Sequence, residues 1–233
     1  MKVTKLSAKG NNLELEFTDA SAAYMNTLRR AVTNETTTLA IELVEMRKNN
    51  SIMYDEMIAH RLGLTPLTSP VGDYALPSDE EMENQEFSAK SSVKGTLAAK
   101  GPCTVYAKDI KFKDAKVKAV YPETPIAKLL EGQEIECEVT AVLGKGKEHS
   151  KWTPGLVYYH EIPKFKGKSL SVADERGLAK ELEKIDETSK DFEARTNHYY
   201  FRVESWGQLS TTDMLTLALD ELNKSLKEFD SLL

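Results

Sequence analysis

The fold is decided by one stretch of the chain, YMNTLRRAV at residues 24–32, which follows one β pattern and precedes another. Its apolar side chains fall within one arc of a helical wheel, and these are Tyr24, Met25, Leu28, Ala31 and Val32. The pattern therefore predicts an amphipathic helix from about Ala20 to Asn34, with Asp19 or Ser21 as its N-cap.

The polar residues of this predicted helix divide between its edge and its outer face. Arg29 falls at the edge of the apolar arc, where its methylene stem can lie along apolar surface. Asn26 and Arg30, four residues apart, lie on the opposite face. A guanidinium at that position is either solvated or a docking group for a partner carboxylate. The pattern by itself favours the solvated state.

Alternating apolar side chains predict a strand on either side of this helix. Before it, residues 13–17 alternate between apolar and acidic, and the turn residues 9–12 make them part of a hairpin. After it, residues 39–44 predict a strand that ends at the turn signal of residues 49–50.

The middle of the chain is predicted to be mainly β. A short helix capped by Ser51 comes first, and residues 77–81 read as an exposed acidic loop. Strand patterns separated by Gly and Pro then fill residues 93–143, and two more strands are expected at residues 156–159 and 198–203.

The chain ends in a long predicted helix that begins at the capping residues 210–213. Apolar residues recur along it at alternating gaps of four and three, which is a heptad seam. The seam residues are Leu215, Leu219, Leu222, Leu226, Phe229 and Leu233. Such a seam either packs into its own core or pairs with a partner's helix. Its narrow, regular form and the extra apolar residues beside its start favour a helix with its own domain on one side and a partner on the other.

Composition narrows the possible classes of protein. The 233 residues are 40% hydrophobic with a net charge of −6. No apolar run reaches membrane-spanning length and no apolar segment follows Met1, so we expect neither a membrane span nor secretion, and a cytoplasmic location. The negative charge argues against a dedicated nucleic-acid-binding protein, although the middle of the chain is mildly basic. No direct, specific nucleic-acid binding is therefore expected.

Few residue patterns could carry chemistry. The four histidines have no metal-binding spacing, and Cys103 and Cys137 form no CxxC pair, so no disulfide framework, metal site or catalytic constellation is predicted. The run Gly144-Lys145-Gly146-Lys147 supports a rival hypothesis, an enzyme that binds a phosphorylated substrate with Glu148 or His149 nearby. Because its spacing is not that of a P-loop, a flexible turn is the preferred interpretation.

Several stretches resemble the alpha-like D family of archaeal RNA polymerase subunits, which is related to bacterial alpha and to the third-largest subunit of eukaryotic polymerase II. They are MNTLRRA at 25–31 with TLAI at 38–41, YDEMIAHRLGLTPL at 54–67, KGP at 100–102 with TVY at 104–106, LGKGKEHSKWTP at 143–154, and VESWG at 203–207. They span most of the chain in the family's order, so the combination is highly specific.

The resemblance implies an α+β fold with two domains. Residues 1–47 and 155–233 would form a discontinuous dimerisation domain, in which antiparallel strands pack with the first helix and the long C-terminal helix. Residues 48–154 would form an inserted, mainly β domain, which opens with the motif residues Tyr54, Asp55, Glu56, His60 and Arg61.

The resemblance also implies a function, that of a non-catalytic assembly subunit of DNA-directed RNA polymerase. The chain would form a heterodimer with subunit L through Leu215, Leu219, Leu222, Leu226 and Phe229, and the dimer would then recruit subunit N and the large catalytic subunits. Asn26, Arg29 and Arg30 resemble the surface that docks on the second-largest subunit. We expect Arg30 to carry most of that docking, because it lies on the outer face.

Metal sites of relatives have no counterpart in this sequence. Many archaeal members carry a ferredoxin-like domain with cysteine-ligated iron–sulphur clusters near the position of residues 164–195, and eukaryotic relatives have a cysteine zinc loop in the inserted domain. This chain has no cysteine at either place, and thiolates are the ligands that such sites need. We therefore expect no cofactor and no metal, with residues 164–195 as a reduced remnant.

Overall fold

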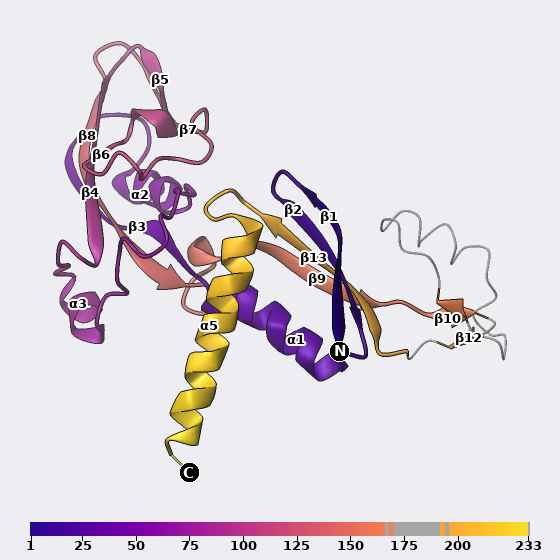
Figure 1. The fold of residues 1–233 in the computed structure, drawn as a ribbon. Coiled ribbons are helices and arrows are strands. Elements are labelled where there is room, and N and C mark those ends of the chain that lie inside the picture. Colours follow the sequence, from indigo (N-terminus) through magenta and orange to yellow (C-terminus); the bar gives the residue numbers. More distant parts are fainter. Residues whose placement is uncertain (166–167, 170–191, 194–195, 233) are drawn as a thin grey trace.

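The computed structural model describes residues 1–165, 168–169, 192–193 and 196–232, and this part of the chain is α+β with several antiparallel sheets and few helices (Figure 1). In chain order the elements are β1 (Lys2–Lys9), β2 (Asn12–Thr18), α1 (Ala22–Arg30), η1 (Ala31–Glu35), β3 (Thr37–Asn49), α2 (Asp55–Gly63), α3 (Asp79–Asn84), β4 (Ser92–Lys100), β5 (Cys103–Tyr106), η2 (Ala107–Asp109), β6 (Lys111–Phe112), β7 (Pro125–Leu129), β8 (Glu134–Lys145), η3 (Ser150–Trp152), β9 (Gly155–Glu161), β10 (Lys164–Phe165), β11 (Lys168–Ser169), β12 (Phe192–Glu193), β13 (His198–Ser205) and α5 (Thr211–Asp230).

The first sheet is built from both ends of the chain, in the order β1-β2-β13-β9. Its central pair is antiparallel, with Leu15 opposite Phe201 and Phe17 opposite Tyr199. The apolar face of this sheet packs with α1 and α5 around Met25 and Met214, which are fully buried. The apolar side chains on one face of β2 and β13 thus form one side of the core, and the two helices form the other.

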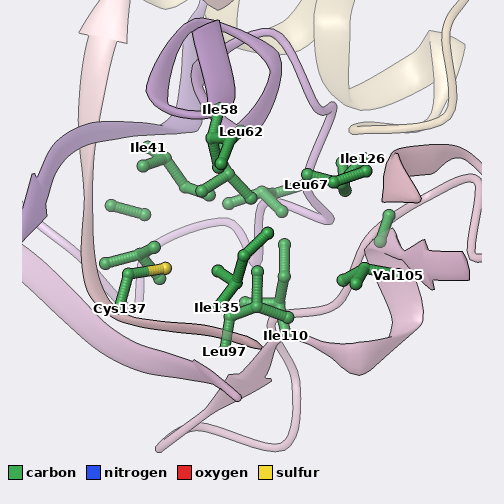
Figure 2. Packing of buried hydrophobic residues seen from close by; sticks show 14 of the residues in the cluster. Ile41, Ile58, Leu62, Leu67, Leu97, Val105, Ile110, Ile126, Ile135 and Cys137 are labelled. Atoms are coloured by element: carbon green, nitrogen blue, oxygen red, sulfur yellow. The ribbon is translucent and has the colours of Figure 1, made fainter. Parts of the chain in front are cut away.

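The second sheet, in the order β3-β8-β4-β6, covers a separate core together with the β5-β7 pair and α2. Figure 2 shows Ile58 and Leu62 of α2 pointing toward Ile41 of β3, with Leu97 and Ile135 on the opposite side of the cluster. Each of these five side chains is at most 1% exposed. This cluster is the largest apolar core among the described residues.

Strand β3 runs across the predicted domain limit between residues 47 and 48. It pairs with β8 along its whole length, from Thr37 opposite Lys145 to Asn49 opposite Ile135. Residues 37–47 therefore share a sheet with the middle of the chain, and the domain limits stay a prediction.

The predicted first helix is present, but its last turn is wider than an α-helix. The Oγ atom of Ser21 accepts a hydrogen bond from the Tyr24 N–H at 3.2 Å, so Ser21 rather than Asp19 is the N-cap. After Arg30 the helix continues directly as the π-helical turn η1. Single π turns of this kind are often found at functional sites.

The short helix after β3 begins later than predicted. Ser51 does not cap it; its hydroxyl donates to the side-chain oxygen of Asn49 at 2.7 Å, which stabilises the turn before the helix. Helix α2 starts at Asp55, with Tyr54 as N-cap and no side-chain cap bond. The local Asn49–Ser51 turn competed with helix capping for the same hydroxyl.

The predicted acidic loop at residues 77–81 is wrong from Asp79 onward, where α3 begins. Ser78 and Glu81 form a capping box, in which each side chain accepts from the other residue's backbone N–H. The S-x-x-E spacing that marks such a box was present in the sequence.

Candidate assembly interface

Helix α5 is anchored to its own domain over only its first turns. The Oγ atom of Ser210 caps it by accepting from the Asp213 N–H at 3.1 Å. Met214 and Ala218 are completely buried, and Leu215 and Leu222 are partly buried against the same core. The side of the helix next to the sheet thus belongs to the chain's own core.

The rest of the predicted seam faces outward. Leu219, Leu226 and Phe229 are 41%, 65% and 61% exposed, and every described residue after Leu222 in this helix is exposed. Figure 1 shows this C-terminal half of α5 extending away from both sheets. Leu233, the last seam residue, lies outside the described residues. Large apolar side chains exposed along one helix are typical of a surface that binds another protein.

The polar residues of α1 are arranged as the helical wheel predicts, with one addition. Arg29 is half-buried and Arg30 is exposed. The Nη2 atom of Arg29 donates to the Oδ1 atom of Asn26 at 3.0 Å, so Asn26 is joined to Arg29 rather than to Arg30. Their proposed docking role stays a prediction.

Arg30 and the α5 seam meet in one hollow, which we call the α1–α5 groove. It has a volume of about 200 Å³ and is lined by Asn26, Thr27, Arg30, Ala31, Asn34, Glu35 and Leu222. The two surfaces that the sequence assigned to different partners, the polar face of α1 and the seam of α5, are therefore contiguous.

The motif residues of the middle segment lie on one short helix, α2, with Tyr54 as its N-cap. Arg61 reaches out of it, and its Nη1 atom donates to the carbonyl oxygen of Ile126 on β7 at 2.8 Å. Asp55 accepts a hydrogen bond from the Asn49 side chain at 2.7 Å. Tyr54, Glu56 and His60 are exposed. Arg61 and Asp55, although also exposed, thus have structural partners, whereas Tyr54, Glu56 and His60 have surface available for contacts.

Gly144 and Gly146 lie where the backbone passes close to other groups of the protein. A Cβ atom on Gly144 would lie closer than 3.0 Å to ring atoms of Trp152, and one on Gly146 would lie closer than 3.0 Å to the Thr33 carbonyl oxygen. Strand β8 continues through Lys145. The predicted flexible turn is therefore wrong for Gly144 and Lys145, because these residues are paired with β3 and packed on a buried indole ring.

The lysines of the same run are engaged by carboxylates. The Nζ atom of Lys145 lies 2.6 Å from Glu221 Oε2 and 3.2 Å from Glu35 Oε2, and Lys147 lies 3.5 Å from the same Glu35 oxygen. Burial works against the charged form of Lys145, but its hydrogen bonds to the two carboxylates raise its pKa. A phosphate would have to compete with these carboxylates for both ammonium groups, so the geometry favours a structural joint over a phosphate site.

Known proteins that are similar to this chain are subunits of RNA polymerase. The family model for the RNA polymerase Rpb3/RpoA insert domain matches residues 41–156. DNA-directed RNA polymerase subunit Rpo3 of Pyrococcus furiosus is 34% identical, over 99% of this chain and 96% of the relative. The chain belongs to the Rpo3 family. The Rpo3 subunits of Pyrococcus horikoshii and Thermococcus kodakarensis are 33% and 32% identical, over 98% and 96% of the chain and 96% and 94% of the relatives.

Membership of the Rpo3 family identifies the chain as an alpha-like subunit of DNA-directed RNA polymerase, as the sequence motifs predicted. The matched range of the insert model includes most of β3 as well as β8, which the structure pairs in one sheet. In the described part of this Rpo3-family chain, no helix is both long and apolar enough to cross a membrane.

The cysteines of this Rpo3-family chain are separated in the fold. Cys137 lies in the large core, where burial raises the pKa of its thiol to about 11, while Cys103 is exposed. Within the described residues, no three His, Cys, Asp or Glu side chains lie close enough together to hold a metal ion. Most of residues 164–195 lies outside the described part of the chain, so the predicted lack of a cofactor stays a prediction.

The residues that sequence reasoning missed are Glu35 and Glu221, together with the true role of Lys145. Glu35 ends the π turn and Glu221 lies on α5, 186 positions later in the chain. No local pattern could pair them. The available signal was a lysine at the end of a strand in a chain whose final helix is acidic.

Proposed function

We propose that this chain is the non-catalytic assembly subunit of a DNA-directed RNA polymerase, pairing with the smaller subunit L through the outer face of α5. The heterodimer then recruits subunit N and the large catalytic subunits in the cytoplasm, without a cofactor on this chain. The observation that carries the proposal is the burial along α5. Met214 and Ala218 are buried in the core of the chain itself, whereas Leu226 and Phe229 are exposed.

Burial of the exposed seam would contribute to pairing. Burial of one large apolar side chain contributes roughly 1.5–3 kcal/mol before the costs of association. Leu219, Leu226 and Phe229 all have surface left to bury. Their spacing of seven and three residues is that of a helix packing along another helix.

Docking of the second-largest subunit is assigned to Arg30 at the edge of the α1–α5 groove. Arg30 is exposed, and among the described residues no carboxylate lies within ion-pairing distance of it. A planar guanidinium in this state can bind a partner carboxylate through two parallel hydrogen bonds. Asn26 and Arg29 support the same surface through their mutual hydrogen bond.

The test is co-expression of the full chain with subunit L, followed by size-exclusion chromatography with light scattering. We expect one complex of the two chains. Replacing Leu226 and Phe229 by Glu should abolish it while the far-ultraviolet circular dichroism of the chain stays unchanged.

Leu156→Glu is the matched control, because Leu156 is 50% exposed and alternation along β9 places it on the opposite face of the sheet from Val157, which packs with Met214 of α5. It should pair like the unmodified chain. Two separately eluting chains would refute the proposal, and a symmetric self-complex without subunit L would replace it with a homodimeric adaptor.

A further inference from the structure

The C-terminal half of α5, after Leu222, projects from the core of the protein. We call the point where the helix leaves the core, at Glu221 and Leu222, its root. Residues after Leu222 make no buried contact with the described part of the chain. At 1.5 Å per residue, the helical residues 223–230 extend about 12 Å beyond the core, so a tilt of roughly 20° at the root displaces the tip by about 4 Å. The direction in which α5 leaves the core therefore determines the positions of Leu226 and Phe229.

Three elements meet at that root. Lys145 at the end of β8 bonds Glu221 on α5 at 2.6 Å and Glu35 on η1 at 3.2 Å. The lysine side chain is only 13% exposed, and the two glutamates are 26% and 34% exposed. The junction also holds a hydrogen bond from Thr36 Oγ1 to the Met214 carbonyl oxygen at 3.4 Å, and one from the Lys147 N–H to the Asn34 carbonyl oxygen at 3.1 Å.

We propose that Lys145 is a positioning residue that sets the direction of α5 for subunit pairing. The inference rests on the proposed function, and it gives the Gly144–Lys147 segment a role in assembly instead of substrate binding. The glycines allow β8 to run against Trp152 and the π turn, and the lysine then spans from the strand end to both helices.

Loss of the Lys145 ammonium would remove its two ion pairs and would also leave two carboxylates without a shared cation. Glu35 and Glu221 both contact the same Nζ atom, so without it two carboxylates would share a half-buried site. Like charges at such distances repel, and Lys147 can compensate only Glu35. The repulsion acts between η1 and α5 and would push these two elements apart.

The experiment compares Lys145→Met with Lys147→Met in the full chain. Methionine keeps the apolar stem and removes the charge; Lys147 is 52% exposed and contacts Glu35 but not α5. One readout is the dissociation constant for subunit L from calorimetry. The other is the distance distribution between spin labels on Ser231→Cys and Lys2→Cys, in a Cys103→Ser background that leaves Cys137 buried.

We expect Lys145→Met to weaken pairing about tenfold or more, a size typical of residues coupled in one charged network, and to broaden the distance distribution. Lys147→Met should change neither. Lys145→Arg should restore both readouts. Glu221→Gln, which breaks the same link from the helix side, should reproduce the loss if Lys145→Met fails to fold.

The outcomes separate the two proposals. If Lys145→Met and Glu221→Gln pair as tightly as Lys147→Met with a narrow distance distribution, the positioning role is overturned. If the unmodified chain does not bind subunit L, the proposed function fails, while the distance distribution still shows whether Lys145 directs α5.

Discussion

At the scale of single residues, the packing of Trp152 explains why position 144 is a glycine. Its indole N–H donates to the Val142 carbonyl oxygen at 3.2 Å, and its own carbonyl accepts from the Thr38 hydroxyl at 2.7 Å. The residue is only 3% exposed and its ring lies on Gly144. Because both the indole N–H and the backbone carbonyl of Trp152 are hydrogen-bonded, the ring cannot move aside easily. Position 144 therefore has no room for a Cβ atom.

Gly144→Ala should therefore destabilise the chain by about 1–3 kcal/mol, the usual cost of overpacking a core. Urea unfolding would measure it. Gly63→Ala is the matched control, since the nearest atom to its new Cβ would be the Ile41 carbonyl oxygen at an ordinary 3.5 Å. Equal stability of the two variants would contradict the packing argument.

Arg30→Ala tests the docking role at the same scale. The exposed guanidinium contributes no described ion pair within the chain, so folding and pairing with subunit L should be unchanged, whereas capture of the second-largest subunit should weaken. Pull-down of that subunit by the purified heterodimer measures the effect. Arg47→Ala, which removes an exposed arginine from β3, should capture normally; unaltered capture by Arg30→Ala would end the assignment.

At the scale of elements, α3 shows how a short helix depends on its cap. Glu81 accepts from the backbone N–H groups of Ser78 at 3.0 Å and Ser88 at 2.9 Å. These bonds, that of Ser78 first, lower the pKa of Glu81 from 4.5 to about 2. Six residues are too few for a stable isolated helix, so α3 relies on them.

The order of α3 should consequently depend on pH. Because the folded pKa is lowered, the contribution of Glu81 is complete above pH 4.5 and is lost as the pH falls toward 2. Amide exchange of residues 79–84, followed by nuclear magnetic resonance, should accelerate across this window. In Glu81→Gln, which keeps an acceptor but cannot titrate, the window should disappear; an unchanged pH response there would assign it to another carboxylate.

At the scale of the whole molecule, two apolar cores are held together at the junction of β3, β8 and the chain's C-terminal part. The Ser69 N–H donates to the Gln208 carbonyl oxygen at 2.9 Å, and Lys145 connects β8 to α5. The helix proposed for pairing is thus joined directly to the sheet of the other core.

Subunit L should raise the unfolding free energy of this chain in proportion to the logarithm of its concentration. At a hundredfold excess over the dissociation constant, the gain is about 2.7 kcal/mol. Thermal unfolding at increasing concentrations of subunit L measures it, with the Leu226→Glu, Phe229→Glu chain as control. A midpoint that does not move with concentration would argue against binding to the native state.

Much of the fold could be predicted because its signals are local. The alternation at residues 13–17 and the apolar arc of residues 24–32 report which faces are buried, and the structure confirms both. The prediction was wrong at Ser51, at α3, and at Gly144 and Lys145, which belong to β8 and not to a turn. At Ser51 a neighbouring side chain took the capping hydroxyl, and at Gly144 a ring from another segment packed on the strand.

The sequence by itself determined the family, most of the helices and strands, and the existence of an apolar seam on the last helix, since periodicity and motifs are properties of neighbouring residues. Only the tertiary structure decided which part of the seam is exposed and that Arg30 shares a groove with Leu222. It also decided that Lys145 joins Glu35 to Glu221. These are contacts between residues far apart in the chain, and such contacts exist only once both cores have formed.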